Sequence, residues 1–196
     1  MRQKKTTSEV YDWDKLDKVI RICETKDKEL GLLLDILRWT GLRVIDGLSL
    51  TWRDIMGDVL SVTEKKTGKR QNRKIQYRFK ERMEYWLSEF NPSNVNDLIF
   101  KSYDMYGNVK PKHQNSMLRR FKIISKRYNG SMTNVGFHSV RKSFGYRLYS
   151  IGRNQNDVIV TLMNIFSHSS QSITLRYIGV ETEKKEELME DFMMDM

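Results

Sequence analysis

The chain has 196 residues, enough for one domain built around one sizeable hydrophobic core. Hydrophobic residues make up 39% of it and charged residues 31%, with only two prolines, which is typical of a folded protein and excludes extensive disorder. Lys and Arg outnumber Asp and Glu by 35 to 25, a formal net charge of +10 that indicates either a polyanionic partner or a basic solvated surface.

Cysteine usage and hydropathy predict a cytoplasmic protein. Cys23 is the only cysteine, so no internal disulfide can form, and its apolar neighbours at helical spacing predict a core thiol. The longest apolar stretch, residues 30–39, is too short to cross a bilayer and contains Asp35 and Arg38. No apolar segment follows the basic residues at the amino terminus, so neither a signal peptide nor a membrane partner is expected.

Two helices are the first elements predicted in chain order. Apolar residues recur at helical spacing over residues 14–24 and 26–39. Gly41 then breaks the pattern, and residues 44–50 continue as one or two further helical turns. Arg43 is therefore expected at a helix junction.

A small three-stranded antiparallel sheet is predicted next. Residues 55–62 indicate a strand, a Gly57-Asp58 turn and a second strand, and residues 73–77 alternate as a third. The second turn, residues 65–72, is basic and contains Gly68, which can adopt positive φ at an exposed hairpin tip.

The rest of the chain is predicted to be helical, so the fold class is mainly α (α+β). The pattern indicates a helix over residues 79–90, a breaker at Pro92, and a strongly basic amphipathic helix over residues 113–128. Four more helices are expected, over residues 139–150, 156–166, 170–177 and 181–192.

Two segments in the first half carry candidate chemistry. Arg43 follows the helix-ending glycine, where it is either an ordinary capping or surface residue or a group that Asp46 holds in place. Lys66 stands in Lys-Thr-Gly-Lys on the hairpin tip. Such a lysine is a solvated basic residue, a phosphate contact, or a general acid if neighbouring positive charge lowers its pKa.

Two more segments follow in the second half. His138 and Arg141 are three residues apart on one helical turn, where they either cap the helix and face solvent or face one phosphate together. His168 precedes Tyr177 by nine residues. Position alone does not single out Tyr177, because any of the nine tyrosines could be a half-buried core residue.

Together, in this order, the four segments resemble the tyrosine recombinase or phage integrase family. The family pattern is a Gly-Leu-Arg box, a β-hairpin lysine, His-x-x-Arg, and His or Trp nine residues before Tyr, and every element is present over residues 40–177. The neighbours of the first box match as well: Leu48, Leu50, Trp52, Asp54 and Ile55. The resemblance covers most of the chain and implies a helical catalytic domain with a small antiparallel sheet.

By this resemblance Tyr177 is the nucleophile, and Arg43 and Arg141 clamp the phosphate that it attacks. A phenol of pKa about 10 is a poor nucleophile at neutral pH, so it needs a base or a cationic pocket. Two arginines supply that pocket and counter the charge of the transition state. No cofactor or metal is expected, since the three histidines are widely separated in sequence and no cysteine pair exists.

The resemblance also implies roles for the remaining polar residues. Lys66 protonates the leaving 5′ oxygen, His138 acts as acid or base, and His168 donates to a non-bridging oxygen. Lys65 and Lys69 flank Lys66, which is preferred because it directly precedes Thr-Gly, as the family lysine commonly does.

Domain organisation and partners are further implications. Residues 1–12 are expected to be a linker stub, 13–180 the catalytic domain, and 181–196 a helical tail that docks in cis or on a neighbouring protomer. The partner is double-stranded DNA, bound by a homotetramer of protomers that are monomers off DNA, with possible DNA-bending accessory proteins at the nucleoid. Family members usually carry a further helical domain before the catalytic domain, so the chain is expected to be either a catalytic fragment or one of the short members that act with a catalytic domain alone.

Departures from the family pattern and rival functions stay open at this stage. Ser167 stands where the family usually has Gly, and Ser139-Val140 replace the more usual Asp-Leu. One rival is a non-catalytic DNA-binding regulator that lays the basic helix, residues 113–128, against phosphates. Another is a type IB topoisomerase, which shares these residue types and relaxes supercoils.

Overall fold

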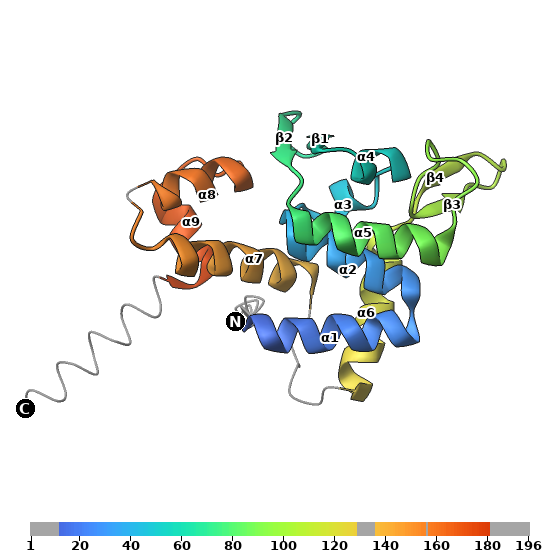
Figure 1. Cartoon of the computed structure of the whole chain (residues 1–196), viewed down its shortest axis with the longest axis horizontal. Helices are drawn as coiled ribbons and strands as arrows, with labels where there is room; N and C mark the ends of the chain where they lie inside the picture. Colours follow the sequence, from blue (N-terminus) through green and yellow to red (C-terminus); the bar gives the residue numbers. More distant parts are fainter. Residues whose placement is uncertain (1–11, 129–135, 156, 181–196) are drawn as a thin grey trace, which may run out of the picture.

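The computed structural model describes residues 12–128, 136–155 and 157–180. This part of the chain is mainly helical with two small antiparallel sheets (Figure 1), so the predicted fold class is confirmed. The predicted tail 181–196 and, apart from Asp12, the predicted linker stub lie outside the described residues. None of the described helices is long and apolar enough to cross a membrane.

Helix α2 (Lys28–Thr40) runs through the main core, and residues 30–38 are all buried. The Asp27 carboxylate starts it by accepting from the Leu30 amide at 3.1 Å, and Gly41 ends it in the left-handed conformation at φ 60°. The helices packed around it are α1 (Trp13–Lys26), α5 (Tyr77–Phe90), α6 (Gln114–Tyr128) and α7 (Phe137–Gly152). Cys23 of α1 is fully buried, as its apolar neighbours predict.

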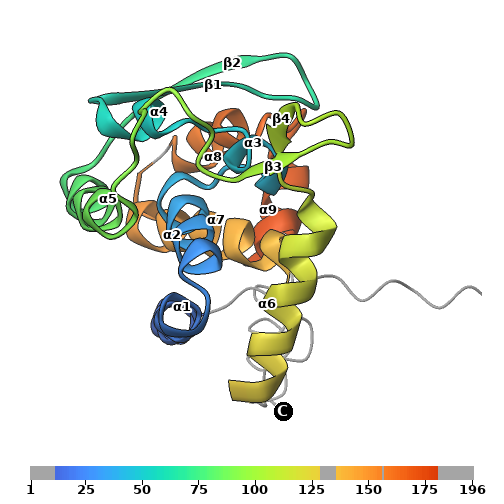
Figure 2. The ribbon, with the colours of Figure 1, turned by 90° about the vertical axis from the view of Figure 1, so that its right-hand side faces the viewer.

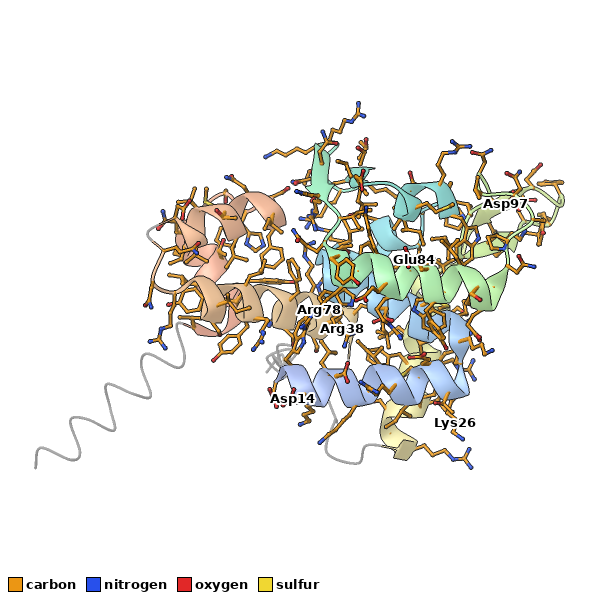
Figure 3. The ribbon with its side chains drawn as sticks, viewed as in Figure 1. Asp14, Lys26, Arg38, Arg78, Glu84 and Asp97 are labelled. Carbon is orange, nitrogen blue, oxygen red and sulfur yellow. The ribbon has the colours of Figure 1, made fainter. Side chains whose placement is uncertain are left out.

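A buried ion network fastens α1, α2 and α5 to one another. The Asp35 carboxylate is fully buried and accepts from Arg38, Arg82 and, at 2.8 Å, the Trp86 indole. Arg38, labelled in Figure 3, also pairs with Asp17 of α1. A buried carboxylate is tolerated only with such a full set of partners, so these helices form a scaffold with one preferred arrangement.

The first sheet has two strands, where three were predicted. Strand β1 (Val59–Thr63) pairs antiparallel with β2 (Arg70–Lys74), and the predicted first strand is instead helix α4 (Trp52–Met56). The reason is a capping box: the Asp54 carboxylate accepts from both the amide and the hydroxyl of Thr51 at 2.7 Å, which starts a helix there. The short helix α3 (Val44–Gly47) precedes it.

The second sheet, β3 (Lys101–Tyr103) with β4 (Val109–Pro111), was not predicted. Its turn is built on Asp104, whose carboxylate accepts from the amides of Tyr106 and Asn108 at 2.8 and 2.9 Å. In Figure 2 the turns of both hairpins point to the same side of the molecule as α9 (Gln171–Ile178).

Helices α8 (Val158–Phe166) and α9 pack on the second half of α7 around a separate apolar cluster that includes Leu162, Phe166, Ile178 and Val180. Gly145 of α7 permits this close approach, because a Cβ built there would lie 2.6 Å from the Phe166 ring. The cluster fixes α9 against α7 and thereby places Tyr177 beside Arg141.

Candidate active site

All six residues singled out in the sequence line one cleft of about 310 Å³. They come from four parts of the chain: the α2–α3 junction, the β1–β2 turn, the start of α7, and the stretch from the α8–α9 turn through α9. The lining residues are Arg43, Lys66, Thr67, His138, Arg141, Ser167, His168, Ser169, Ile173 and Tyr177. The fold therefore brings together side chains that are up to 134 positions apart in sequence, from 43 to 177.

Both arginines of the cleft donate to the same carbonyl. Arg43 Nη2 donates to Phe166 O at 3.0 Å, and Arg141 Nη2 donates to it at 3.2 Å. Arg141 also donates to Gly41 O, and its guanidinium lies 4.5 Å from the centroid of the Phe166 ring. Burial lowers the pKa of Arg141, and the charge of Arg43 lowers it further. Two cations held this close favour an anion bound between them.

The Tyr177 ring packs edge-on between His168 and Phe166, with centroid separations of 5.1 and 5.3 Å. Burial raises the pKa of the phenol, while Arg141 and Arg43 oppose that rise. The phenol is therefore protonated at neutral pH. His168 Nδ1 is 3.1 Å from the Thr174 hydroxyl, which orients the ring.

The β1–β2 turn brings a lysine to the edge of the cleft. Lys66 is exposed and borders the cleft, whereas Lys65 and Lys69 are not among its lining residues. The Lys65 amide donates to the buried Asp46 carboxylate at 3.0 Å, which fastens the turn to α3. Asp46 thus holds the hairpin, and in the described part of the chain the carboxylate that pairs with Arg43 is Glu64, at 2.8 Å.

Residues 9–184 match the family described as Phage integrase family. The chain belongs to the phage integrase family. The probable integrase/recombinase YoeC of Bacillus subtilis (strain 168) is 30% identical over 144 residues, which is 72% of this chain and 72% of that protein.

Solved structures of the same fold include members bound to DNA. XerH site-specific recombinase in a post-cleavage complex with palindromic difH substrate has a TM-score of 0.66 at 19% identity, covering 89% of this chain and 50% of that one. The catalytic domain of bacteriophage HP1 integrase has a TM-score of 0.56 at 20% identity, covering 87% of each chain. A lambda integrase tetramer bound to a Holliday junction has a TM-score of 0.64 at 18% identity, and the match covers 50% of that chain. This integrase-family chain therefore spans half the length of the XerH and lambda integrase chains.

Ser167, which departs from the family's usual glycine, ends α8 in the left-handed conformation at φ 54°. Glycine adopts this conformation without steric cost, which accounts for the usual residue. The serine compensates through its side chain, because its hydroxyl oxygen lies 3.0 Å from Gln71 Nε2 on β2. The hairpin is thereby tied to the loop that carries His168.

Arg73 is a site neighbour that the sequence analysis missed. It lies on β2 and donates to Ile165 O at 2.9 Å and to Thr40 O, so it joins the hairpin to the ends of α8 and α2. Burial, and then the nearby charge of Arg141, lower its pKa to about 10. As the third guanidinium behind the cleft, it adds to the positive field there.

Arg73→Met is expected to lower the free energy of unfolding by about 1–3 kcal/mol, because both carbonyls lose their donor. Chemical denaturation measures this directly. Lys74→Met on the same strand is the matched control, since Lys74 is exposed and its removal should change stability by less than about 0.5 kcal/mol. Equal changes in the free energy of unfolding for the two variants would show that Arg73 has no special structural role.

Stability is expected to fall as the pH drops below 6.5, the ordinary pKa of histidine. Burial, and then the charge of Arg141, lower the pKa of both His138 and His168. The folded protein then binds fewer protons than the unfolded chain, so stability is intact above pH 6.5 and is lost as the pH falls through the lowered pKa values.

Urea unfolding at about pH 7.5 and about pH 5.5 tests this pH dependence. His168→Gln should show a smaller loss of stability between the two pH values than the parent chain. His113→Gln is the matched control, because His113 is exposed and outside the cleft, and it should show the full loss. The same loss of stability in all three proteins would contradict the assignment of this pH dependence to His168.

Proposed function

We propose that the chain is the catalytic domain of a tyrosine-type site-specific recombinase, with residues 13–180 forming that domain. In this proposal Tyr177 cuts one strand of duplex DNA and holds its 3′ phosphate. The observation that carries the proposal is the convergence of two arginines, two histidines, a lysine and a tyrosine on one cleft. Such a set matches what phosphoryl transfer to a phenol requires.

The cleavage step exchanges one phosphoester bond for another. The Tyr177 oxygen forms a bond to phosphorus as the bond to the 5′ oxygen breaks. The phenolic proton passes to a base, for which His138 is suited because its lowered pKa leaves it neutral at pH 7. Lys66 gives a proton to the leaving 5′ oxygen. Arg43 and Arg141 neutralise the charge that builds up on the non-bridging oxygens.

His168 completes the cleft by donating a hydrogen bond to a non-bridging oxygen. Its Nδ1 lies 3.1 Å from the Thr174 hydroxyl, so Nε2 is assigned to the phosphate, and it donates in the tautomer in which Nδ1 accepts from Thr174. The phosphotyrosine keeps the energy of the original ester, so rejoining to a different 5′ hydroxyl requires no ATP. Strand exchange is then the reverse reaction with a new partner strand.

The proposed assembly is a tetramer of protomers on two DNA duplexes, formed from monomers off DNA. The support is the likeness to a lambda integrase tetramer bound to a Holliday junction and the net charge of +10, which favours binding to phosphates. The segment 181–196 is proposed to dock on a neighbouring protomer or in cis. DNA-bending accessory proteins and a location at the nucleoid belong to the same proposal.

A nicked suicide duplex that carries a candidate recombination site tests the function. The nick lets the short fragment that carries the new 5′ hydroxyl diffuse away, so the strand cannot be rejoined. The covalent intermediate therefore accumulates, and it survives denaturation. A phosphotyrosine adduct mapped to Tyr177 by peptide mass spectrometry supports the proposal. Binding without an adduct supports a regulator, and relaxation of supercoiled DNA without recombinant product supports a type IB topoisomerase.

A further inference from the structure

Glu64 is an acidic residue held beside a cleft that otherwise collects positive charge. It follows β1, its side chain is 1% exposed, and Oε2 lies 2.8 Å from Arg43 Nη1. The same Oε2 accepts from the Thr67 hydroxyl at 2.6 Å. The Ser167 hydroxyl is a further donor to this carboxylate. Three segments of the cleft therefore meet at one buried side chain.

The carboxylate is ionised at neutral pH. Burial on its own raises the pKa of Glu64, but donation from Thr67 and Arg43 and then from Ser167 lowers it below its ordinary value. A fixed negative charge next to Arg43 works against binding of a phosphodiester. Because Glu64 weakens phosphate binding in this way, its role must lie elsewhere. Its contacts indicate that it positions neighbouring residues.

The contacts of Glu64 fix the turn that carries Lys66. The turn is closed by the Glu64 amide donating to Lys69 O at 2.9 Å and by the Gly68 amide donating to Glu64 O at 2.8 Å. The side-chain contact to Thr67 holds the residue next to Lys66, and the contact to Arg43 sets this turn against the arginine pair. Arg43 Nη1 is buried against this carboxylate, while Nη2 donates to Phe166 O at 3.0 Å.

We infer that Glu64 is a positioning residue that sets the Lys66 ammonium at the leaving 5′ oxygen by linking the hairpin tip to Arg43. The inference rests on the proposed function, because it assumes that Lys66 is the general acid. Proton transfer in a transition state requires hydrogen-bond reach between donor and acceptor, so a displaced lysine slows the step in which the leaving group departs.

Thr67→Val is the sharpest test, because it is nearly isosteric and removes the hydroxyl that donates to Glu64 at 2.6 Å; that hydroxyl also accepts from the Lys69 amide at 3.3 Å. Thr63→Val is the matched control: Thr63 is exposed on β1 and lies outside the cleft. Each protein is given two suicide duplexes, one with the natural 5′ oxygen and one with sulfur at that bridging position. A thiol has a pKa of about 8.5, so sulfur leaves without the protonation that an alkoxide needs.

Thr67→Val is expected to cleave the oxygen duplex about tenfold more slowly than the parent chain and the sulfur duplex within about twofold of it. Thr63→Val should match the parent on both. Glu64→Ala should cleave the oxygen duplex more slowly than Thr67→Val does. Its cleavage rate should rise by at least about tenfold on the sulfur duplex. Glu64→Gln keeps an oxygen that can accept the hydrogen bond from Thr67, so its cleavage rate should fall less than that of Glu64→Ala.

Two results overturn the inference. Thr67→Val and Glu64→Ala could cleave the oxygen duplex at the parental rate, or Thr67→Val could be slowed equally on oxygen and sulfur. Thr67 is exposed, so Thr67→Val decides the question even where Glu64→Ala fails to fold. Failure of the proposed function looks different, because the parent chain then forms no adduct with either duplex.

Discussion

Tyr177→Phe is expected to abolish the covalent adduct on a suicide duplex, with a loss of at least about 10³-fold in cleavage rate. The change removes only the phenolic oxygen, so the nucleophile is lost while the aromatic ring stays. The edge-on contacts with His168 and Phe166 involve that ring and are retained. Denaturing gel electrophoresis of the protein with labelled DNA measures the adduct.

DNA binding separates loss of the nucleophile from loss of structure. Tyr177→Phe should bind the intact duplex within about twofold of the parent chain, because phosphate contacts by cationic side chains dominate such affinity. Tyr149→Phe is the matched control, since Tyr149 is partly buried against the same apolar cluster and lies outside the cleft. A normal adduct yield from Tyr177→Phe would assign the nucleophile to another residue.

The helices were predictable because their periodicity is a local property of the sequence. Helical spacing over residues 26–39 and the glycine after it predict α2 and its end at Gly41, and the structure confirms both. The sheet was predicted less well. Residues 55–62 alternate like strands, but the capping box of Thr51 and Asp54 starts a helix before them. The β3–β4 strands are three residues long, too short to show a pattern.

The candidate residues were predictable because they stand in four recognisable local patterns, whereas the residues that hold them were not. The contact of Glu64 with Arg43 joins positions 21 residues apart, from 43 to 64, and nothing in local spacing indicates it. Asp46, three residues from Arg43, was the nearer candidate partner, yet it accepts from the Lys65 amide. Pairing of this kind is decided by how the hairpin folds over α3.

The basic helix shows the same limit of local reading. Arg120 of α6 pairs with Asp27 and Glu29 and so holds α6 to the start of α2. Arg119 and Lys122, its neighbours, are exposed. Charge along a helix therefore divides into a structural part and a part that is free to meet phosphates, and only the tertiary contacts separate the two.

The Phe166 carbonyl organises the catalytic chemistry that we propose. This carbonyl accepts hydrogen bonds from both Arg43 and Arg141, and the Phe166 ring packs on Tyr177. The end of α8 therefore sets the distance between the arginine pair and the nucleophile. A change in the fork of donors at this carbonyl should affect cleavage far more than stability.

Arg141→Lys is expected to slow cleavage by about 10²–10³-fold while the charge is retained. Arg141 donates from Nη1 to Gly41 O and from Nη2 to Phe166 O, and a single ammonium cannot hold both contacts and also meet two phosphate oxygens. Single-turnover cleavage of the suicide duplex measures the loss.

Arg147→Lys provides the matched control for this change. Arg147 is exposed on the same helix and lies outside the cleft, so its replacement should leave the cleavage rate within about twofold. Equal rates for the Arg141 and Arg147 variants would mean that positive charge alone suffices at position 141. A selective loss at Arg141 means that the planar geometry of the guanidinium is what the transition state requires, because both variants keep the same net charge.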